Sequence, residues 1–242
     1  MRFPVTKEGF NLIKLFTGLS AGFYVLTYWS KLFLLLSASS LIITLFLCYF
    51  FRDPERVCLQ EERVVLSPAD GKVIDITEED YTELIQGPAW VIKIFMSVFN
   101  VHVQRAPLEG MVRSTAYRKG TFLPAMKEEA DRKNEQNIIT IQTSSTGTET
   151  RGLQPVYVAV KQIAGILARR IVCWCKEGDQ LNRGQRIGMI MFGSQVDMFL
   201  PKKVTLRIEK GDRVVAGVTV VGEWNEGESR AVSYTHLTLP TN

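Results

Sequence analysis

The sequence predicts a mainly β domain of the α+β class with glycine-rich β-hairpins, preceded by an N-terminal transmembrane helical hairpin. Three observations support this. Apolar residues crowd residues 10–51, short β-branched runs bounded by turn residues follow them, and a Gly-Asp turn recurs near the end. We expect an anchor over residues 1–56, a folded domain over residues 57–228 and a tail over residues 229–242.

The apolar segment contains two candidate helices, over about residues 12–29 and 32–51. Residues 32–51 carry no charge, and a helix of that length rises ~1.5 Å per residue to cover a bilayer core of about 30 Å. Only Lys31 separates this run from the first, which Gly18 and Gly22 interrupt. A tight hairpin and a single span preceded by an interfacial helix both fit this pattern.

Basic residues flank the apolar segment on both sides, at Arg2, Lys7 and Lys14 before it and at Arg52 and Arg56 after it. Positive charge at both flanks favours a hairpin with both ends in the cytoplasm. We therefore expect the domain to lie on the cytoplasmic side of the inner membrane.

The remainder of the chain is typical of a β-rich domain. Residues 78–85 are polar, and we expect a short helix or a loop there. Short β-branched runs that predict strands occupy residues 64–66, 73–76, 90–95, 137–142 and 156–160.

A weak internal repeat relates residues 177–184 to residues 210–217. Each copy has Gly-Asp at a turn, then an apolar residue, then a glycine six positions after the first glycine. This spacing predicts paired β-hairpins whose glycines take positive φ. Biotinyl and lipoyl carrier domains share the spacing, so a membrane-anchored carrier module is one alternative function, with Lys202 or Lys203 as its candidate lysine.

Charge and cysteine content argue against two classes of partner. The net charge of +4 is mild and forms no basic stripe, so we expect no nucleic acid partner. Cys173 and Cys175 have neither a second cysteine pair nor nearby histidines, so we expect no metal site.

Three short segments contain side chains that could act as an acid, a base or a nucleophile. His102 lies in NVHVQRAP and shares a strand face with Asn100 and Gln104, and an imidazole suits proton transfer. Asp70 lies in SPADGKV at a predicted strand corner. A Ser-His-Asp hydrolase built on such residues is a second alternative, although no Gly-x-Ser-x-Gly elbow is present.

The third segment is FGSQVDMFLP, where Gly193-Ser194 interrupts two apolar runs. A small polar pair is unusual for packing at such a place. Glycine permits a strained backbone and lets a nucleophile approach its carbonyl closely.

Taken together these blocks resemble the short, archaeal-type class of phosphatidylserine decarboxylase proenzymes. The resemblance is carried in the family's order by FFRDPER after a membrane helix, SPADGKV, NVHVQRAP, GTF, NEQN, QIAG, ARRIVCW and FGSQVDMFLP. It spans residues from about 50 to about 225, nearly all of the predicted domain.

The resemblance implies that the chain cuts itself between Gly193 and Ser194, and that the two pieces stay associated as a heterodimer. Ser194 would become a pyruvoyl group, the only cofactor, which forms a Schiff base with phosphatidylserine and acts as an electron sink. Asp70 would orient His102, and His102 would move the protons. Longer relatives have a second histidine where this chain has Arg105.

The resemblance also suggests partners. They are a phospholipid substrate, a membrane and a further copy of the chain in a homo-oligomer. Arg105, Arg169 and Arg170 are candidates for binding the substrate's phosphate or carboxylate. Residues 229–242 resemble a translated adaptor tail; we expect them to be disordered, and one interpretation is that they are not native.

Overall fold

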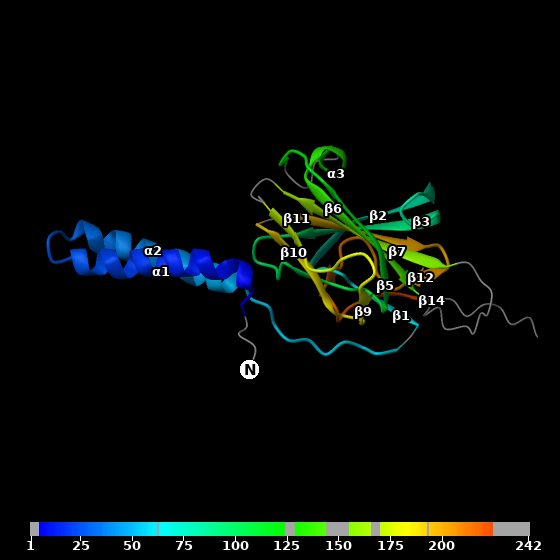
Figure 1. The fold of residues 1–242 in the computed structure, drawn as a ribbon, viewed down its shortest axis with the longest axis horizontal. Coiled ribbons are helices and arrows are strands. Elements are labelled where there is room, and N and C mark those ends of the chain that lie inside the picture. The colour runs from blue at the N-terminus through cyan, green and yellow to red at the C-terminus, as the bar shows by residue number, and fades with distance from the viewer. Residues whose placement is uncertain are drawn as a thin grey trace, which may run out of the picture.

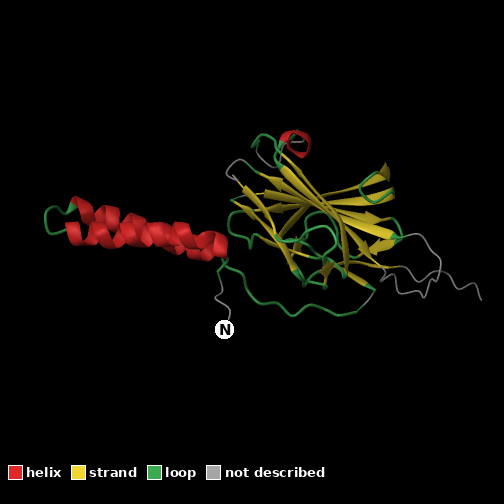
Figure 2. Cartoon of the chain, in the orientation of Figure 1, coloured by secondary structure: helices red, strands yellow, loops and turns green. Residues whose placement is uncertain are grey.

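The computed structural model describes residues 5–61, 63–123, 129–143, 155–165, 170–192 and 194–224. Gly193, Arg169 and residues 229–242 fall outside these ranges, so the predictions made for them stay predictions. A pair of long helices extends from one side of a β domain (Figures 1 and 2).

The apolar segment forms an antiparallel hairpin of α1 (Phe10–Leu26) and α2 (Leu32–Phe50), preceded by a 3-10 helix, η1 (Lys7–Gly9). Serines join the two helices: Ser20 Oγ donates to the Ser37 carbonyl at 3.0 Å, and Ser37 Oγ donates to the Ser20 carbonyl at 2.9 Å. Such bonds satisfy hydroxyl groups where no water is at hand. Both helices are long and apolar enough to cross a membrane. The predicted helical hairpin is confirmed.

The base of the hairpin packs against the β domain. Thr6 Oγ1 donates to the Met189 sulfur at 3.5 Å, and Trp174 Nε1 donates to Glu8 Oε1 at 2.9 Å. Phe50 and Phe51 are fully buried there and form an apolar cluster with Met189 and other side chains of the domain. The helices therefore join the domain through a packed contact as well as through the connecting chain.

Three antiparallel sheets make up the β domain (Figure 1). The largest has the order β13-β2-β3-β11-β7-β6-β5-β9, and the two smaller ones have the orders β4-β10-β8 and β1-β14-β12. The strands are β1 (Val64–Leu66), β2 (Gly71–Thr82), β3 (Gly87–Met96), β4 (Val103–Arg105), β5 (Gly110–Arg118), β6 (Gln136–Thr143), β7 (Val156–Ala164), β8 (Arg170–Cys173), β9 (Gln180–Leu181), β10 (Arg186–Met191), β11 (Ser194–Pro201), β12 (Val204–Leu206), β13 (Arg213–Val214) and β14 (Val220–Trp224), with one short helix, α3 (Ala130–Lys133).

The mainly β prediction is confirmed, with one correction. All five predicted runs fall inside strands β1, β2, β3, β6 and β7. The expectation of a helix or loop over residues 78–85 is wrong for its first half, because Glu78 pairs with Trp90 and Glu79 with Ala89 in the β2–β3 ladder. Their side chains are exposed, so a polar sequence is compatible with this stretch of strand.

The glycine repeat produces two equivalent turns. Asp179 Oδ2 accepts from Lys176 N at 2.8 Å, and Asp212 Oδ2 accepts from Glu209 N at 2.8 Å. The four glycines have positive φ, as predicted: Gly178 (88°), Gly184 (72°), Gly211 (108°) and Gly217 (71°).

The duplication also includes the strands next to these turns, because each turn is followed by a short strand that pairs with a long one. β13 pairs with β2 at Gly71, and β9 pairs with β5 at Gly110. A Cβ on Gly71 would lie 2.2 Å from the Phe95 carbonyl oxygen, and one on Gly110 would lie 2.4 Å from that of Gln142. Both glycines thus allow a close backbone approach. The same repeat is visible in the sequence as Pro-Ala-Asp-Gly at residues 68–71 and Pro-Leu-Glu-Gly at residues 107–110. Each segment forms a corner before a long strand, and Asp70 lies in the first.

Alternate residues of β11 face opposite sides of its sheet. Val196, Met198 and Leu200 enter the main apolar core. On the other side Gln195 Nε2 donates to Asp197 Oδ1 at 2.7 Å and to Asp131 Oδ1 of α3 at 2.9 Å. Burial, reinforced by the charge of Asp131, raises the pKa of Asp197 to about 7, although Gln195, Lys161 and Lys93 oppose that rise.

This raised pKa predicts a pH-dependent stability. The folded protein holds a proton that the unfolded chain has lost between about pH 4 and about pH 7, so the free energy of unfolding falls as pH rises through that window. Asp197→Asn removes the titration and keeps an oxygen acceptor for Gln195. We expect the thermal unfolding midpoint of the Ser194→Ala protein to fall less from about pH 5 to about pH 8 when Asp197→Asn is added. If the unfolding midpoint falls equally with pH in the proteins with and without Asp197→Asn, the proposed titration of Asp197 is wrong.

Candidate active site

Ser194 begins β11, where the chain passes from the β4-β10-β8 sheet into the eight-stranded sheet. Its backbone pairs with Met96 of β3 on one side and with Ala164 of β7 on the other. The side chain is fully buried, and Oγ donates to the Met96 sulfur at 3.4 Å. A thioether is a weak acceptor, so this bond competes poorly with any stronger base that reaches the hydroxyl.

The backbone just before Ser194 is strained. Phe192 has a φ of 64°, in the left-handed region that a bulky side chain rarely occupies. Phe192 and Gln86 are the only non-glycine residues with positive φ in the described ranges. Strain of this kind costs of order 1–3 kcal/mol and clusters at functional sites. Gly193, which follows, lies outside the described residues.

His102 is fully buried and precedes β4. Its Nδ1 lies 2.9 Å from the Asn100 carbonyl oxygen. A carbonyl can only accept, so Nδ1 holds the proton and Nε2 presents its lone pair. Nε2 is buried and has no hydrogen-bond partner among the described residues. Burial lowers the pKa of His102 to about 4, so the ring is neutral at physiological pH.

The ring of Phe50, the last residue of α2, lies between His102 and Phe192. Its centroid is 4.4 Å from that of the imidazole and 4.5 Å from that of Phe192. Phe50 thus helps to exclude water from His102 and joins the histidine to the segment that leads into Ser194. In the sequence Phe50 ends the second apolar run and begins FFRDPER, and neither pattern predicts its contact with His102.

Asp70 lies at its predicted corner, but its carboxylate binds other groups than the imidazole. Arg56 donates two hydrogen bonds to it, at 2.6 and 2.8 Å, and Ala216 N donates a third at 2.8 Å. Asp70 acts on His102 through its charge, which raises the pKa of the histidine against the larger effect of burial. The hydrogen bond that orients the imidazole is the one that Nδ1 donates to the Asn100 carbonyl.

A chain of buried amides supports the histidine from the domain interior. Asn137 Nδ2 donates to Gln162 Oε1 at 2.8 Å, Gln162 Nε2 to Gln104 Oε1 at 2.9 Å, and Gln104 Nε2 to the His102 carbonyl at 2.8 Å. The alternation in NVHVQ placed Gln104 on the face of His102. Its partner Gln162 comes from β7, and the partner of Gln162, Asn137, comes from β6. Only the fold reveals these two contacts.

The arginines proposed to bind substrate have different surroundings. Arg105 is buried and donates to the carbonyl oxygens of Gly184 at 3.1 Å and Pro54 at 2.9 Å. Arg170 is exposed at the start of β8 and pairs with Met191, shortly before Ser194. Of the two described arginines, Arg170 is therefore the one with a guanidinium open to a ligand.

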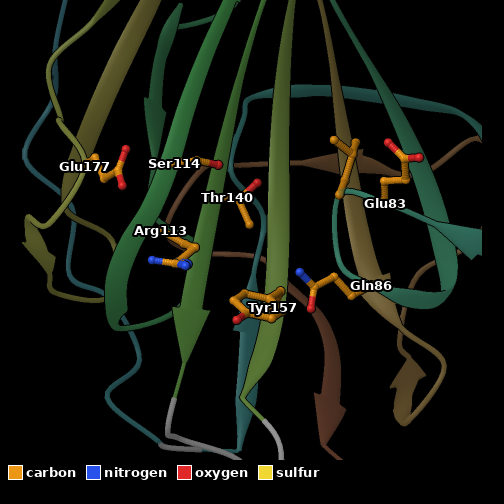
Figure 3. Close-up of a pocket in the computed structure, with 8 residues that line it drawn as sticks. Glu83, Gln86, Arg113, Ser114, Thr140, Tyr157 and Glu177 are labelled. Atoms are coloured by element: carbon orange, nitrogen blue, oxygen red, sulfur yellow. The ribbon is translucent and has the colours of Figure 1, made fainter.

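A cavity of about 460 Å³ lies away from these residues, at the other end of the sheet (Figure 3). Tyr157 of its wall is seven residues along β7 from Ala164, the partner of Ser194, or about 23 Å at ~3.3 Å per residue. Its lining residues are Glu83, Leu84, Gln86, Arg113, Ser114, Thr140, Tyr157 and Glu177. Within the described ranges no three His, Cys, Asp or Glu side chains gather as metal ligands would.

Comparison with known proteins identifies the family. A family model described as phosphatidylserine decarboxylase matches residues 43–222. The phosphatidylserine decarboxylase proenzyme of Syntrophus aciditrophicus (strain SB) is 41% identical over 220 residues, covering 90% of this chain and 96% of the relative. That of Geotalea uraniireducens (strain Rf4) is 42% identical over 219 residues, with the same coverage of 90% and 96%. That of Carboxydothermus hydrogenoformans is 46% identical over 182 residues, covering 75% and 81%.

The matched segment includes every strand up to Gly222 in β14, together with Phe50, Asp70, His102 and Ser194. The relatives align over most of their own length as well. On these grounds the chain belongs to the phosphatidylserine decarboxylase family.

Proposed function

We propose that this enzyme converts phosphatidylserine to phosphatidylethanolamine and CO₂, after cutting itself between Gly193 and Ser194 to make a pyruvoyl group from Ser194. Family membership supports the reaction. One observation carries the self-processing: a neutral, buried imidazole with an unpartnered Nε2 shares the Phe50 ring with the strained segment that leads to Ser194. Such a nitrogen suits a general base.

In the proposed maturation, His102 Nε2 accepts the proton of Ser194 Oγ as the oxygen attacks the Gly193 carbonyl carbon. The C–N bond breaks as His102 gives this proton to the Ser194 nitrogen, which becomes a free amine, and the Gly193 acyl group is left as an ester on Ser194 Oγ. Loss of the Ser194 α-proton to a base then expels the Gly193 carboxylate and leaves dehydroalanine. Water hydrolyses this to the pyruvoyl group with release of ammonia. The positive φ of Phe192 supports cleavage here, because breaking the chain relieves the strain.

Asp70 acts in this proposal as a fixed negative charge. When His102 takes up a proton, the imidazolium forms in a buried site where a charge is unfavourable. Asp70 offsets part of that cost through its effect on the pKa of His102. Arg56 and Ala216 N hold the carboxylate in position.

The membrane hairpin supports a lipid substrate, with the domain on the cytoplasmic side as the flanking charges predict. The pyruvoyl group supplies an electrophilic carbonyl that holds the substrate's amine and withdraws electrons from the breaking bond. Arg170 is the proposed contact for the phosphate or carboxylate, because it is exposed and pairs with Met191, three residues before Ser194. His102 is the candidate to return a proton to the product.

The carrier alternative receives less support. Lys202 forms an ion pair with Glu78, and its Nζ lies 3.5 Å from the centroid of the Trp90 ring, so the side chain is engaged where a carrier needs a free lysine. A Ser-His-Asp hydrolase would use the same three residues and keep the chain intact. Intact mass separates all three functions.

Self-cleavage is tested by gel electrophoresis and mass spectrometry of the expressed chain. We expect two pieces, the smaller beginning with a pyruvoyl-blocked residue 194, and a single piece for Ser194→Ala. His102→Ala should slow cleavage by about 10²–10⁴-fold, as loss of a general base does. Asp70→Asn should slow it less, because Asp70 acts only through its charge.

Ser114→Ala, on β5 in the distant cavity, is the matched control and should mature fully. An uncleaved wild-type chain, or a cleaved Ser194→Ala chain, would rule out the mechanism.

The lowered pKa of His102 predicts the pH profile of maturation. The base form is half populated at about pH 4, so the cleavage rate should be level from about pH 8 to about pH 6 and fall only towards pH 4. Phe50→Ala admits water to the imidazole and should move this midpoint upward. Leu45→Ala, at an exposed position of α2, should not. A wild-type midpoint near 6.5, the ordinary pKa of histidine, would contradict the proposed environment.

The cleaved pieces should remain associated. β11, the start of the smaller piece, pairs with β3 from Ser194 to Pro201 and with β7 from Ser194 to Phe199. Maturation removes only the N–H of residue 194, so the pairing from Gln195 onward stays intact. We expect the two pieces to elute together in mild detergent and to separate only when the domain unfolds in denaturant. Release of the small piece while the circular dichroism of the sheet persists would refute this.

A further inference from the structure

The loop between β3 and β4 displays a large apolar side chain beside the membrane hairpin. Phe99 is 64% exposed, although its loop is well ordered by hydrogen bonds. Asn100 N donates to the Ser97 carbonyl at 2.9 Å, and Ser97 N donates to Asn100 Oδ1 at 2.9 Å. A rigid turn thus holds an aromatic ring in the open, an arrangement that is unfavourable in water.

Tyr49 in the last turn of α2 and Arg52 just after the helix hold this loop. Tyr49 Oη donates to the Phe99 carbonyl at 3.2 Å, and Arg52 Nη2 donates to the same oxygen at 2.7 Å. The Arg52 guanidinium also lies 3.8 Å from the centre of the Tyr49 ring. Tyrosine and arginine are typical of the boundary between acyl chains and headgroups.

The length of α2 gives the depth of this loop. Its 19 residues span about 28 Å at ~1.5 Å each, close to the ~30 Å of a bilayer core. Tyr28 and Trp29, at 89% and 71% exposed, occupy the opposite end of the hairpin. Tyr49 therefore lies at one boundary of the core, and Phe99, held by Tyr49 and Arg52, lies at the same level.

We propose that residues 97–100 are a second membrane contact, in which Phe99 enters the bilayer beside α2, at the boundary of headgroups and acyl chains. The occupant of this apolar surface is lipid, because the surface is continuous with the hairpin that spans the bilayer. The proposal rests on the membrane placement of α1 and α2 in the proposed function, and it does not depend on self-cleavage.

This contact links the membrane to the candidate base. Asn100, the residue after Phe99, accepts the hydrogen bond from His102 Nδ1. A loop seated in the headgroup layer thus fixes the level of the imidazole relative to the lipid. A headgroup carboxylate can then approach the site without the acyl chains leaving the bilayer.

Photocrosslinking tests the contact directly. We would replace Phe99 by p-benzoylphenylalanine in the Ser194→Ala chain, reconstitute it in vesicles of phosphatidylcholine and phosphatidylglycerol, and irradiate. The same replacement at Tyr81 is the control, because Tyr81 is equally exposed, at 65%, and lies at the far end of the β2–β3 ladder. That ladder is about 33 Å long at ~3.3 Å per residue over the ten residues of β3.

We expect phospholipid adducts on the peptide that contains position 99 and none at position 81. No lipid adduct at 99, equal adducts at both positions, or a protein crosslink in place of lipid at 99 would overturn the proposal. The chain that retains Ser194 is expressed with the same replacement in parallel. Cleavage without lipid adducts would refute only this inference, whereas adducts without cleavage would refute only the self-processing.

Discussion

The contact between Phe50 and His102 is the interaction on which the candidate site depends. It covers the imidazole with the last residue of the apolar helix α2, and the burial to which it contributes keeps the ring neutral. The same phenyl ring packs on Phe192, whose strained backbone leads into Ser194. One side chain from the helical hairpin thus contacts both the candidate base and the segment that leads into Ser194. The hairpin is therefore part of the candidate site.

β11 would let the domain tolerate the proposed break before Ser194. Ser194 has a strand on each side, so the backbone that follows it is paired in two ladders. On one face of the strand the side chains fill the apolar core, and on the other Asp197 and Gln195 meet α3. The duplicated glycine turns hold β2 and β5, the strands that follow the two equivalent corners. At the first of these corners Arg56 binds the Asp70 carboxylate, whose charge raises the pKa of His102.

Local patterns predicted most of the fold because their causes are local. Apolar length predicted the helices, β-branched runs predicted the strands, and the spacing of Gly178 and Gly184 predicted turns with positive φ. The error over residues 78–85 arose because β2 continues beyond the core, where paired backbone and exposed acidic side chains coexist. Composition cannot distinguish such a strand from a loop.

The sequence by itself determined that a long apolar segment precedes a β domain, and which few residues have side chains suited to proton transfer and nucleophilic attack. Only the tertiary structure decided their environment. In the folded protein His102 Nδ1 donates to the Asn100 carbonyl, the Asp70 carboxylate binds Arg56, and the Phe50 ring packs on the imidazole. Such partners are distant in the chain and meet only when sheets and helices pack. Burial and charge, which set the pKa of a group, depend on that packing and are invisible to sequence spacing.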